Sequence, residues 1–143
     1  MITLKFKELA DMKDYEIASA CSLFKRVYTG LTPEEIISRI YRGANLAGYS
    51  FCLAYEYDDI CGVAFYRIDW RTHSGAILFV DTLAAFPSGK GIGRKLLDEL
   101  STLGAKNSCA LVQLDCRIEN ADASRFYYDY GMERRASSFI KRL

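Results

Sequence analysis

The sequence predicts a single α/β domain built on a mixed β-sheet. Its 143 residues, of which 50% are hydrophobic and 26% charged, have the size and composition of one soluble globular domain. Strand-like and helical segments alternate in the second half, and this order requires at least one parallel pair of strands. There are only two prolines and no internal repeat. We therefore expect one domain over residues 1–143 with the order βααβββαβαβ.

The chain is expected to begin with a strand and two helices. Alternating residues at 2–8 predict the strand, and apolar residues at helical spacing predict a helix between residues 11 and 28. A second helix is expected to begin at Thr32, because Glu35 stands three residues later and completes a capping box. This helix is expected to end near Gly43.

Three strands should follow as an antiparallel meander. The segments 49–57 and 60–69 are rich in aromatic and β-branched residues, and Asp58-Asp59 between them is a hairpin signal. The third strand, 76–84, contains an apolar run that is typical of a strand buried on both faces.

The last part of the chain alternates helix and strand. Apolar residues on one face predict a helix over 91–105, and the apolar run at 109–117 predicts a strand. A short helix is expected from residue 120 or 122 to Gly131, since glycine commonly follows a helix end. Residues 137–143 are expected to form the last strand.

The net charge of the chain is small. Nineteen Lys and Arg against eighteen Asp and Glu leave +1, so no bulk field attracts nucleic acid or an anionic membrane. No apolar run approaches the ~20 residues that span a bilayer, and the N-terminal segment lacks the apolar core of a signal peptide. We therefore expect a cytoplasmic protein that acts on neither nucleic acids nor membranes.

The cysteine and histidine content argues against a metal site. His73 is the single histidine, and no two cysteines have the C-x-x-C spacing of a zinc or redox site. Most of the cysteines lie in apolar runs, where a free thiol behaves as a small hydrophobe. We expect reduced thiols in a reducing compartment. The five cysteines stand at positions 21, 52, 61, 109 and 116.

The sharpest feature is a glycine-rich turn between the strand 76–84 and the helix 91–105. Glycine admits positive φ and lets a ligand approach the backbone closely. The helix after the turn leaves its first N–H groups unpaired, and its dipole adds partial positive charge. With the nearby cations, these groups make a site suited to a diphosphate. The glycines are Gly89, Gly91 and Gly93, and the cations are Lys90, Arg94 and Lys95.

Two common nucleotide motifs fit this turn poorly. A Walker P-loop, G-x-x-x-x-G-K-(S/T), does not occur in the chain. A dinucleotide fingerprint needs G-x-G-x-x-G directly after a strand, whereas this chain has G-x-G-x-G after a five-residue gap, Ala85 to Gly89. Asp115 lies at a suitable distance beyond Gly91 for a ribose contact, so dinucleotide binding stays an alternative. Too little chain follows for a second nucleotide-binding half.

The motifs around the turn reduce the number of candidate ligands. The run S-G-K-G-I-G (88–93) resembles the (Q/R)-x-x-G-x-(G/A) signature of the GNAT superfamily of acyl-CoA N-acyltransferases. L-A-A-F-P (83–87) resembles the L-x-V-x-P segment that precedes it, and L-D-C (114–116) stands where the family's next strand stands. The run N-x-x-A-x-x-F-Y-x-x-x-G-M (120–132) is similar to the family's N-x-x-A-x-x-F-Y-x-x-x-G-F. Ser88 departs from the usual Gln or Arg, which removes one side-chain contact and leaves the backbone cradle intact.

The resemblance implies acetyl-CoA as the acyl donor and assigns residues to it. Backbone groups of Leu83, Ala84 and Ala85 would pair with the pantetheine arm, and Asn120 would bond to the same arm. The diphosphate would lie on the amides that follow the turn. These amides belong to Lys90, Gly91, Ile92, Gly93, Arg94 and Lys95, with Gly89 in the turn itself.

Acylation of an amine needs a base for the amine and an acid for the departing thiolate. The resemblance implies Tyr127 as the acid, and a phenol with a pKa of about 10 is protonated at neutral pH. Asp81 is the leading candidate base, since a carboxylate inside an apolar strand should have a raised pKa. Glu119 and Asp115 are alternatives, acting through water. The N–H of Leu83 could polarise the thioester carbonyl.

Three of these residues also have a purely structural interpretation. Asp81 can brace the end of its strand, and Asn120 can cap the helix that follows it. Tyr127 lies on an apolar stripe with Ala123 and Phe126, which is typical of a core residue.

We expect an N-acetyltransferase that transfers an acetyl group from acetyl-CoA to a primary amine of a small molecule, protein or peptide by direct attack in a ternary complex. The alternative is a non-catalytic acyl-CoA-binding regulatory module. The resemblance assigns the acceptor site to the first two helices and the loops near 43–50 and 70–75. A last strand at the sheet edge would allow a homodimer to form through 137–143.

Overall fold

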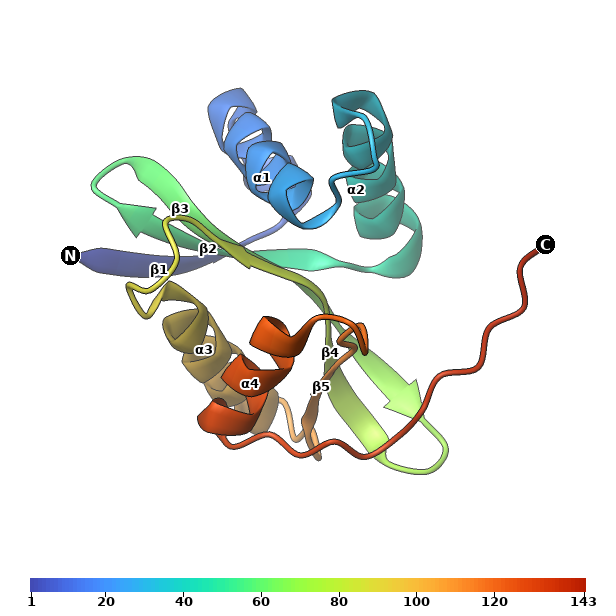
Figure 1. The fold of residues 1–143 in the computed structure, drawn as a ribbon. Coiled ribbons are helices and arrows are strands. Elements are labelled where there is room, and N and C mark those ends of the chain that lie inside the picture. Colours follow the sequence, from blue (N-terminus) through green and yellow to red (C-terminus); the bar gives the residue numbers. More distant parts are fainter.

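The structure, a computed structural model, describes residues 1–143 and contains a five-stranded sheet with four α-helices. The strands lie in the order β1-β2-β3-β4-β5, antiparallel except for the parallel pair β4 and β5 (Figure 1). The predicted mixed sheet is therefore confirmed. The elements are β1 (Ile2–Lys7), a short 3₁₀ turn (Leu9–Asp11), α1 (Asp14–Val27), α2 (Pro33–Ala47), β2 (Ser50–Glu56), β3 (Asp59–Arg71), β4 (Gly75–Ala85), α3 (Ile92–Lys106), β5 (Val112–Leu114) and α4 (Ala121–Tyr130).

Helices cover both faces of the sheet. The pair α1 and α2 packs on one face, and α3 and α4 pack on the other (Figure 1). Side chains alternate along a strand, so Leu53 of β2 contributes to the core under α1 and α2 while Cys52 and Ala54 contribute to the core under α3. This explains why the central strands are apolar on both faces.

The register between β3 and β4 changes at Asp81. Phe65 pairs with Thr82, but the next residue of β3, Tyr66, pairs with Val80. Asp81 is thus the extra residue of a β-bulge. Bulges bend a strand and redirect a side chain, and this one lies where β4 begins to leave β5.

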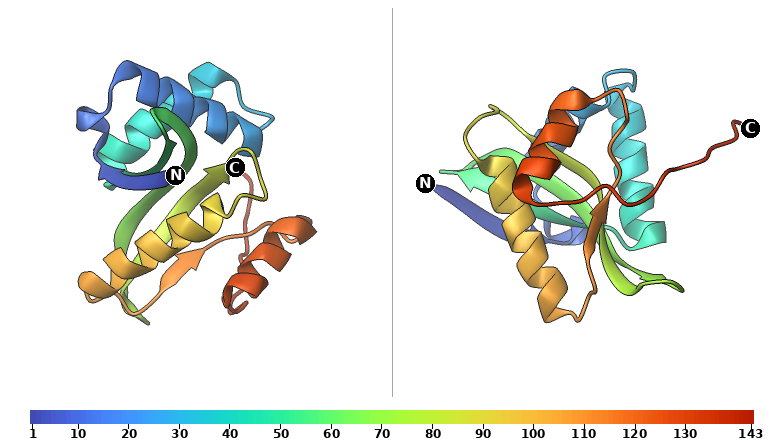
Figure 2. Two further views of the ribbon diagram at one scale, coloured as in Figure 1. Left: turned by 90° about the vertical axis from the view of Figure 1, so that its left-hand side faces the viewer. Right: turned by 60° about the horizontal axis from the view of Figure 1, so that its bottom comes forward.

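The strands β4 and β5 pair over only three residues, from Leu78 to Val80 on β4. Residues 82–85 keep their pairing with β3 and have no partner on the β5 side. The two strands therefore diverge toward the start of α3, with α4 beyond β5 (Figure 2). One backbone edge of β4 is left free at this point.

The second helix is longer than the sequence suggested. The capping box at Thr32 and Glu35 is present, but α2 continues past Gly43 to Ala47, and it is followed by Gly48, whose φ is 75°. Gly43 lies inside the helix, and the residue there is a glycine because a Cβ would lie only 3.0 Å from the ring of Phe65. The expected end near Gly43 was wrong, because close packing on β3 explains this glycine.

The predicted last strand at 137–143 is absent. These residues are extended but pair with no strand, and Phe139 and Ile140 are 96% and 75% exposed (Figure 1). A strand needs a neighbouring backbone, and β5 has three residues where nine were expected at 109–117. The order is therefore βααβββαβα. A homodimer through residues 137–143 stays a prediction.

Candidate functional site

The N-terminus of α3 presents unpaired amide donors to the glycine turn. The first helical hydrogen bond runs from the N–H of Lys95 to the carbonyl of Gly91, at 3.1 Å. The preceding amides, those of residues 92–94, have no backbone partner, and no side chain caps the helix. Three free N–H groups at a helix N-terminus form a site for an anion.

The three glycines of the turn serve different purposes. Gly89 and Gly91 have φ values of 83° and 74°, in the left-handed region that favours glycine. No atom lies within 4 Å of where a Cβ would stand on either of them, so the space above the turn is open. Gly93 is different, because the ring of Phe126 lies 3.1 Å from its Cβ position. Gly93 lets α4 pack closely against α3.

The basic side chains of the turn are not equivalent either. Lys90 and Lys95 are exposed and form no ion pair in the protein. The guanidinium of Arg94 lies 5.1 Å from the ring centre of Tyr130 and 3.5 Å from the carbonyl of Asp129. Arg94 therefore braces the end of α4, and the two lysines are the cations of the turn that remain free to contact an anion.

The segment Leu83–Ala85 has one backbone edge that pairs with no other strand. Ala84 packs into the core under α1 and α2, while Leu83 and Ala85 pack against the core under α3. Their side chains are fixed on the two faces, and their backbone edge lies on the diverging side of β4. An extended ligand can add to such an edge as a further strand would.

Asp81 lies beside this segment, but its surroundings differ from those expected. Asp81 lies inside β4, as expected, but its side chain is exposed because it belongs to the bulge, so the apolar surroundings expected for its carboxylate were wrong. The hydroxyl of the buried Thr82 donates to its Oδ2 at 3.1 Å. The hydroxyl of Tyr28, on the segment after α1, lies 2.7 Å from the same Thr82 oxygen.

Sequence reasoning missed Tyr28 and Thr82. Tyr28 is 54 residues from Thr82 in the chain, and no motif links the two. Burial raises the pKa of Tyr28, and the neighbouring Asp81 carboxylate adds to the increase. These groups come together only because the end of α1 packs against β4 in the folded structure.

Tyr127 lies on α4 and is partly buried. It packs against the core under α3, as its apolar stripe indicated. Burial raises the pKa of Tyr127 to about 12, and neighbouring Cys116 and Tyr28 add to the effect. The phenol therefore carries its proton throughout the neutral range.

The remaining candidates lie outside this group. The side chain of Asn120 accepts the N–H of Ala123 at 3.1 Å and caps α4. Asp115 is exposed, and Glu119 is tied to Arg117 at 2.8 Å. Hydrogen bonding to Arg117 lowers the pKa of Glu119, which makes it a weaker base.

A cavity of about 290 Å³ opens next to Asp81, between α1, α2 and the sheet. Apart from Asp81 and Arg39, the side chains that line it are apolar or aromatic. They are Phe24, Tyr28, Leu31, Ile36, Ile40 and Phe65.

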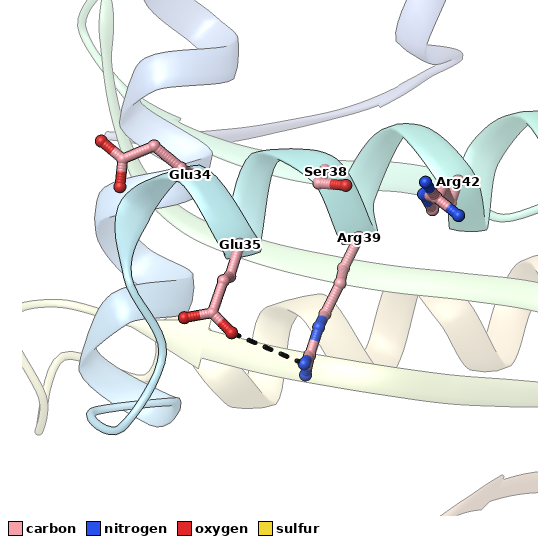
Figure 3. A pocket seen from close by; sticks show the side chains of 5 residues that line it. All are labelled: Glu34, Glu35, Ser38, Arg39 and Arg42. Carbon is pink, nitrogen blue, oxygen red and sulfur yellow. Dashed lines mark ion pairs between the residues drawn. The ribbon is translucent and has the colours of Figure 1, made fainter.

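A larger hollow of about 460 Å³ lies along α2 but has different properties. All five side chains that line it are charged or polar and come from α2 alone, as Figure 3 shows. They include Glu35 and Arg39, which form an ion pair at 3.8 Å. One helix cannot enclose a ligand, so we assign this hollow to the solvated face of α2.

Three further features concern metal ions, membranes and thiols. No group of three or more His, Cys, Asp or Glu side chains comes together in a way that could hold a metal ion. None of the helices combines the length and the apolar composition needed to cross a bilayer. All five cysteines are free thiols.

Comparisons with known proteins agree with this geometry. Residues 17–132 match the model of the acetyltransferase (GNAT) family. No curated protein matches the chain. Among solved structures, the aminoglycoside N-acetyltransferase AAC(6')-Iy in complex with CoA is similar, with a TM-score of 0.81 and 15% identity, over 100% of this chain and 95% of that one.

A ribosomal-protein-alanine N-acetyltransferase from Brucella melitensis biovar Abortus 2308 has a TM-score of 0.78 and 16% identity, over 100% of both chains. An acetyltransferase from Trypanosoma brucei has a TM-score of 0.75 and 19% identity, again over 100% of both. At these identities the structures show a shared fold. With the match of the family model over most of the sequence, they establish that the chain belongs to the GNAT acetyltransferase family.

Proposed function

We propose that the protein transfers an acetyl group from acetyl-CoA to a primary amine. The observation that carries the proposal is the uncapped N-terminus of α3 beside the free edge of β4. The N-terminus of α3 supplies three amide donors for a diphosphate, and the edge of β4 supplies an extended backbone for the pantetheine arm. Similar structures that were solved with CoA support this assignment.

Acetyl-CoA would supply the activated acyl group. The amine attacks the thioester carbonyl directly, so an amide C–N bond forms and the C–S bond breaks. Asp81 takes a proton from the amine, and Tyr127 gives its proton to the thiolate sulfur. A phenol with a pKa of about 12 is protonated at neutral pH, as a general acid must be.

The groups around Asp81 orient its carboxylate. Thr82 donates its single hydroxyl hydrogen to Asp81, so Tyr28 must be the donor in its hydrogen bond with Thr82. This chain holds one oxygen of Asp81 and leaves the other free for the amine.

Binding and turnover test the proposal separately. Isothermal titration should show that acetyl-CoA binds, and a thiol-release assay should show CoA production that depends on an amine. Absence of binding would refute the assigned site. Binding without CoA release across a broad amine panel would instead favour the alternative, a non-catalytic acyl-CoA-binding module. Competition by NAD at the same site would favour a dinucleotide.

A further inference from the structure

The cavity next to Asp81 is continuous with the proposed transfer site. Asp81 is one of the residues that line the cavity, and it is the extra residue of the bulge in β4. Tyr28 forms part of the wall and is hydrogen-bonded to Thr82. An amine that reaches Asp81 through this cavity places the rest of its structure against this wall.

Most of the side chains that line the cavity are apolar or aromatic. Leu31, in the α1–α2 connection, is half-buried and presents aliphatic surface, and Ile36 and Ile40 of α2 lie behind it, almost completely buried. A hydroxyl or second ammonium placed against such groups loses its hydration without gaining a partner. A methylene placed there gains by leaving water.

The charged side chains of the cavity also favour an acceptor with a single positive charge. Asp81 is the only carboxylate in the lining, and Arg39 is the only cation. Arg39 forms one ion pair, with Glu35 at 3.8 Å. An acceptor with several positive charges would meet one carboxylate and one repelling guanidinium.

The volume sets the size of the acceptor. A cavity of about 290 Å³ corresponds to roughly ten water molecules at their volume in the liquid. Pockets that hold small molecules have volumes of about 300–1,000 Å³, so this cavity suits an acceptor at the small end of that range.

From these observations we infer that the acceptor is a small primary monoamine with an apolar body, an alkylamine or arylalkylamine. This inference rests on the proposed acetyltransferase function and narrows its substrate class. The amine lies at Asp81, and the hydrocarbon part packs against Leu31, Ile36 and Ile40. Polyamines and other polycationic acceptors are excluded by the single carboxylate and by Arg39.

A homologous series of amines gives a direct test. Thiol release is measured with acetyl-CoA and the alkylamines from ethylamine to hexylamine, then phenethylamine, then spermidine. We expect kcat/KM to rise roughly threefold or more with each added methylene until the cavity is filled. Spermidine should lie at least tenfold below phenethylamine. A flat series, or spermidine equal to phenethylamine, would overturn the inference.

A pair of variants tests whether the preference for apolar amines arises in this cavity. Leu31→Glu places a carboxylate in the apolar wall and should lower kcat/KM for phenethylamine at least tenfold while the KM for acetyl-CoA is unchanged. Ile37→Glu is the matched control, because Ile37 is exposed on α2 and does not line the cavity. Equal activity of Leu31→Glu and wild type with phenethylamine would contradict the inference.

A binding measurement separates this inference from the proposed function. Phenethylamine and spermidine are titrated into the protein saturated with CoA. Binding of phenethylamine that Leu31→Glu abolishes supports the apolar site even without turnover. If acetyl-CoA binds and spermidine is acetylated while phenethylamine neither binds nor reacts, the acetyltransferase function stands and the substrate class is wrong.

Discussion

The hydroxyl of Tyr28 lies 2.7 Å from the hydroxyl of Thr82 and joins the end of α1 to the bulged part of β4. Thr82 in turn donates to Asp81. The contact therefore couples the helix that walls the cavity to the carboxylate that is proposed to take the proton. It also places a rigid link at the point where β4 leaves β5.

Asp81→Asn should reduce kcat at least 100-fold at neutral pH while the affinity for acetyl-CoA is retained, because a neutral amide cannot accept the proton of the amine. Steady-state kinetics and isothermal titration measure the two quantities. Asp115→Asn is the control and should keep its activity, since Asp115 is exposed and has no contact with this chain of hydroxyls. If Asp115→Asn is the inactive variant, the base has been misassigned.

Tyr127→Phe should lower kcat strongly and leave the dissociation constant of acetyl-CoA unchanged. The ring keeps its packing against the core under α3, and only the acid proton is lost. Tyr128→Phe, one position along α4 and 55% exposed, is the matched control. Unchanged turnover in Tyr127→Phe would leave this tyrosine with a packing role alone.

Gly91→Glu should abolish acetyl-CoA binding. The substitution puts a side chain and a negative charge into the open space above the free amides of α3. Gly48→Glu tests whether backbone strain alone is responsible, because Gly48 has nearly the same φ, 75°, at the far end of α2. Normal titration of acetyl-CoA into folded Gly91→Glu would show that the diphosphate binds elsewhere.

Gly62→Ala should weaken acetyl-CoA binding although the new methyl group makes no contact with the ligand. A Cβ at Gly62 would lie 2.6 Å from Cγ2 of Ile92 at the start of α3, so the helix must shift. We expect a loss of about 1–3 kcal/mol in the free energy of unfolding and a higher dissociation constant. Gly30→Ala, with no atom near its Cβ position, should change neither. Urea unfolding and calorimetry provide the two measurements.

Glu16→Gln should make the protein less sensitive to acid. Burial alone would raise the pKa of Glu16, which is 1% exposed, but hydrogen bonds from the N–H of Lys13, from Tyr55 and from Lys7 lower it to about 2. Because the folded pKa is below the usual 4.5, the carboxylate stabilises the fold above pH ~4.5, and this contribution disappears as the pH falls toward 2.

At pH 7 the Glu16→Gln variant should be less stable than wild type by about 2 kcal/mol, and this difference should shrink between pH 5 and 2. Urea unfolding at several pH values measures it, with the exposed Glu34→Gln as control. A difference that stays constant with pH would contradict the assignment.

The local pattern of residues determined most elements of this fold. Thr32 and Glu35 fixed the start of α2, and the alternating glycines marked the entry to α3. These signals succeed because caps and turns depend on residues only a few positions apart. The motifs after residue 83 likewise indicated the family.

Tertiary structure decided the rest, because the responsible contacts join distant parts of the chain. The close approach of Phe65 explains the glycine at position 43 inside α2, and residues 137–143 form no strand because they pair with no neighbouring strand. The bulge that exposes Asp81 arises from the register of β3 and β4. The apolar cavity and the contact between Tyr28 and Thr82 exist only once α1 and α2 have packed on the sheet.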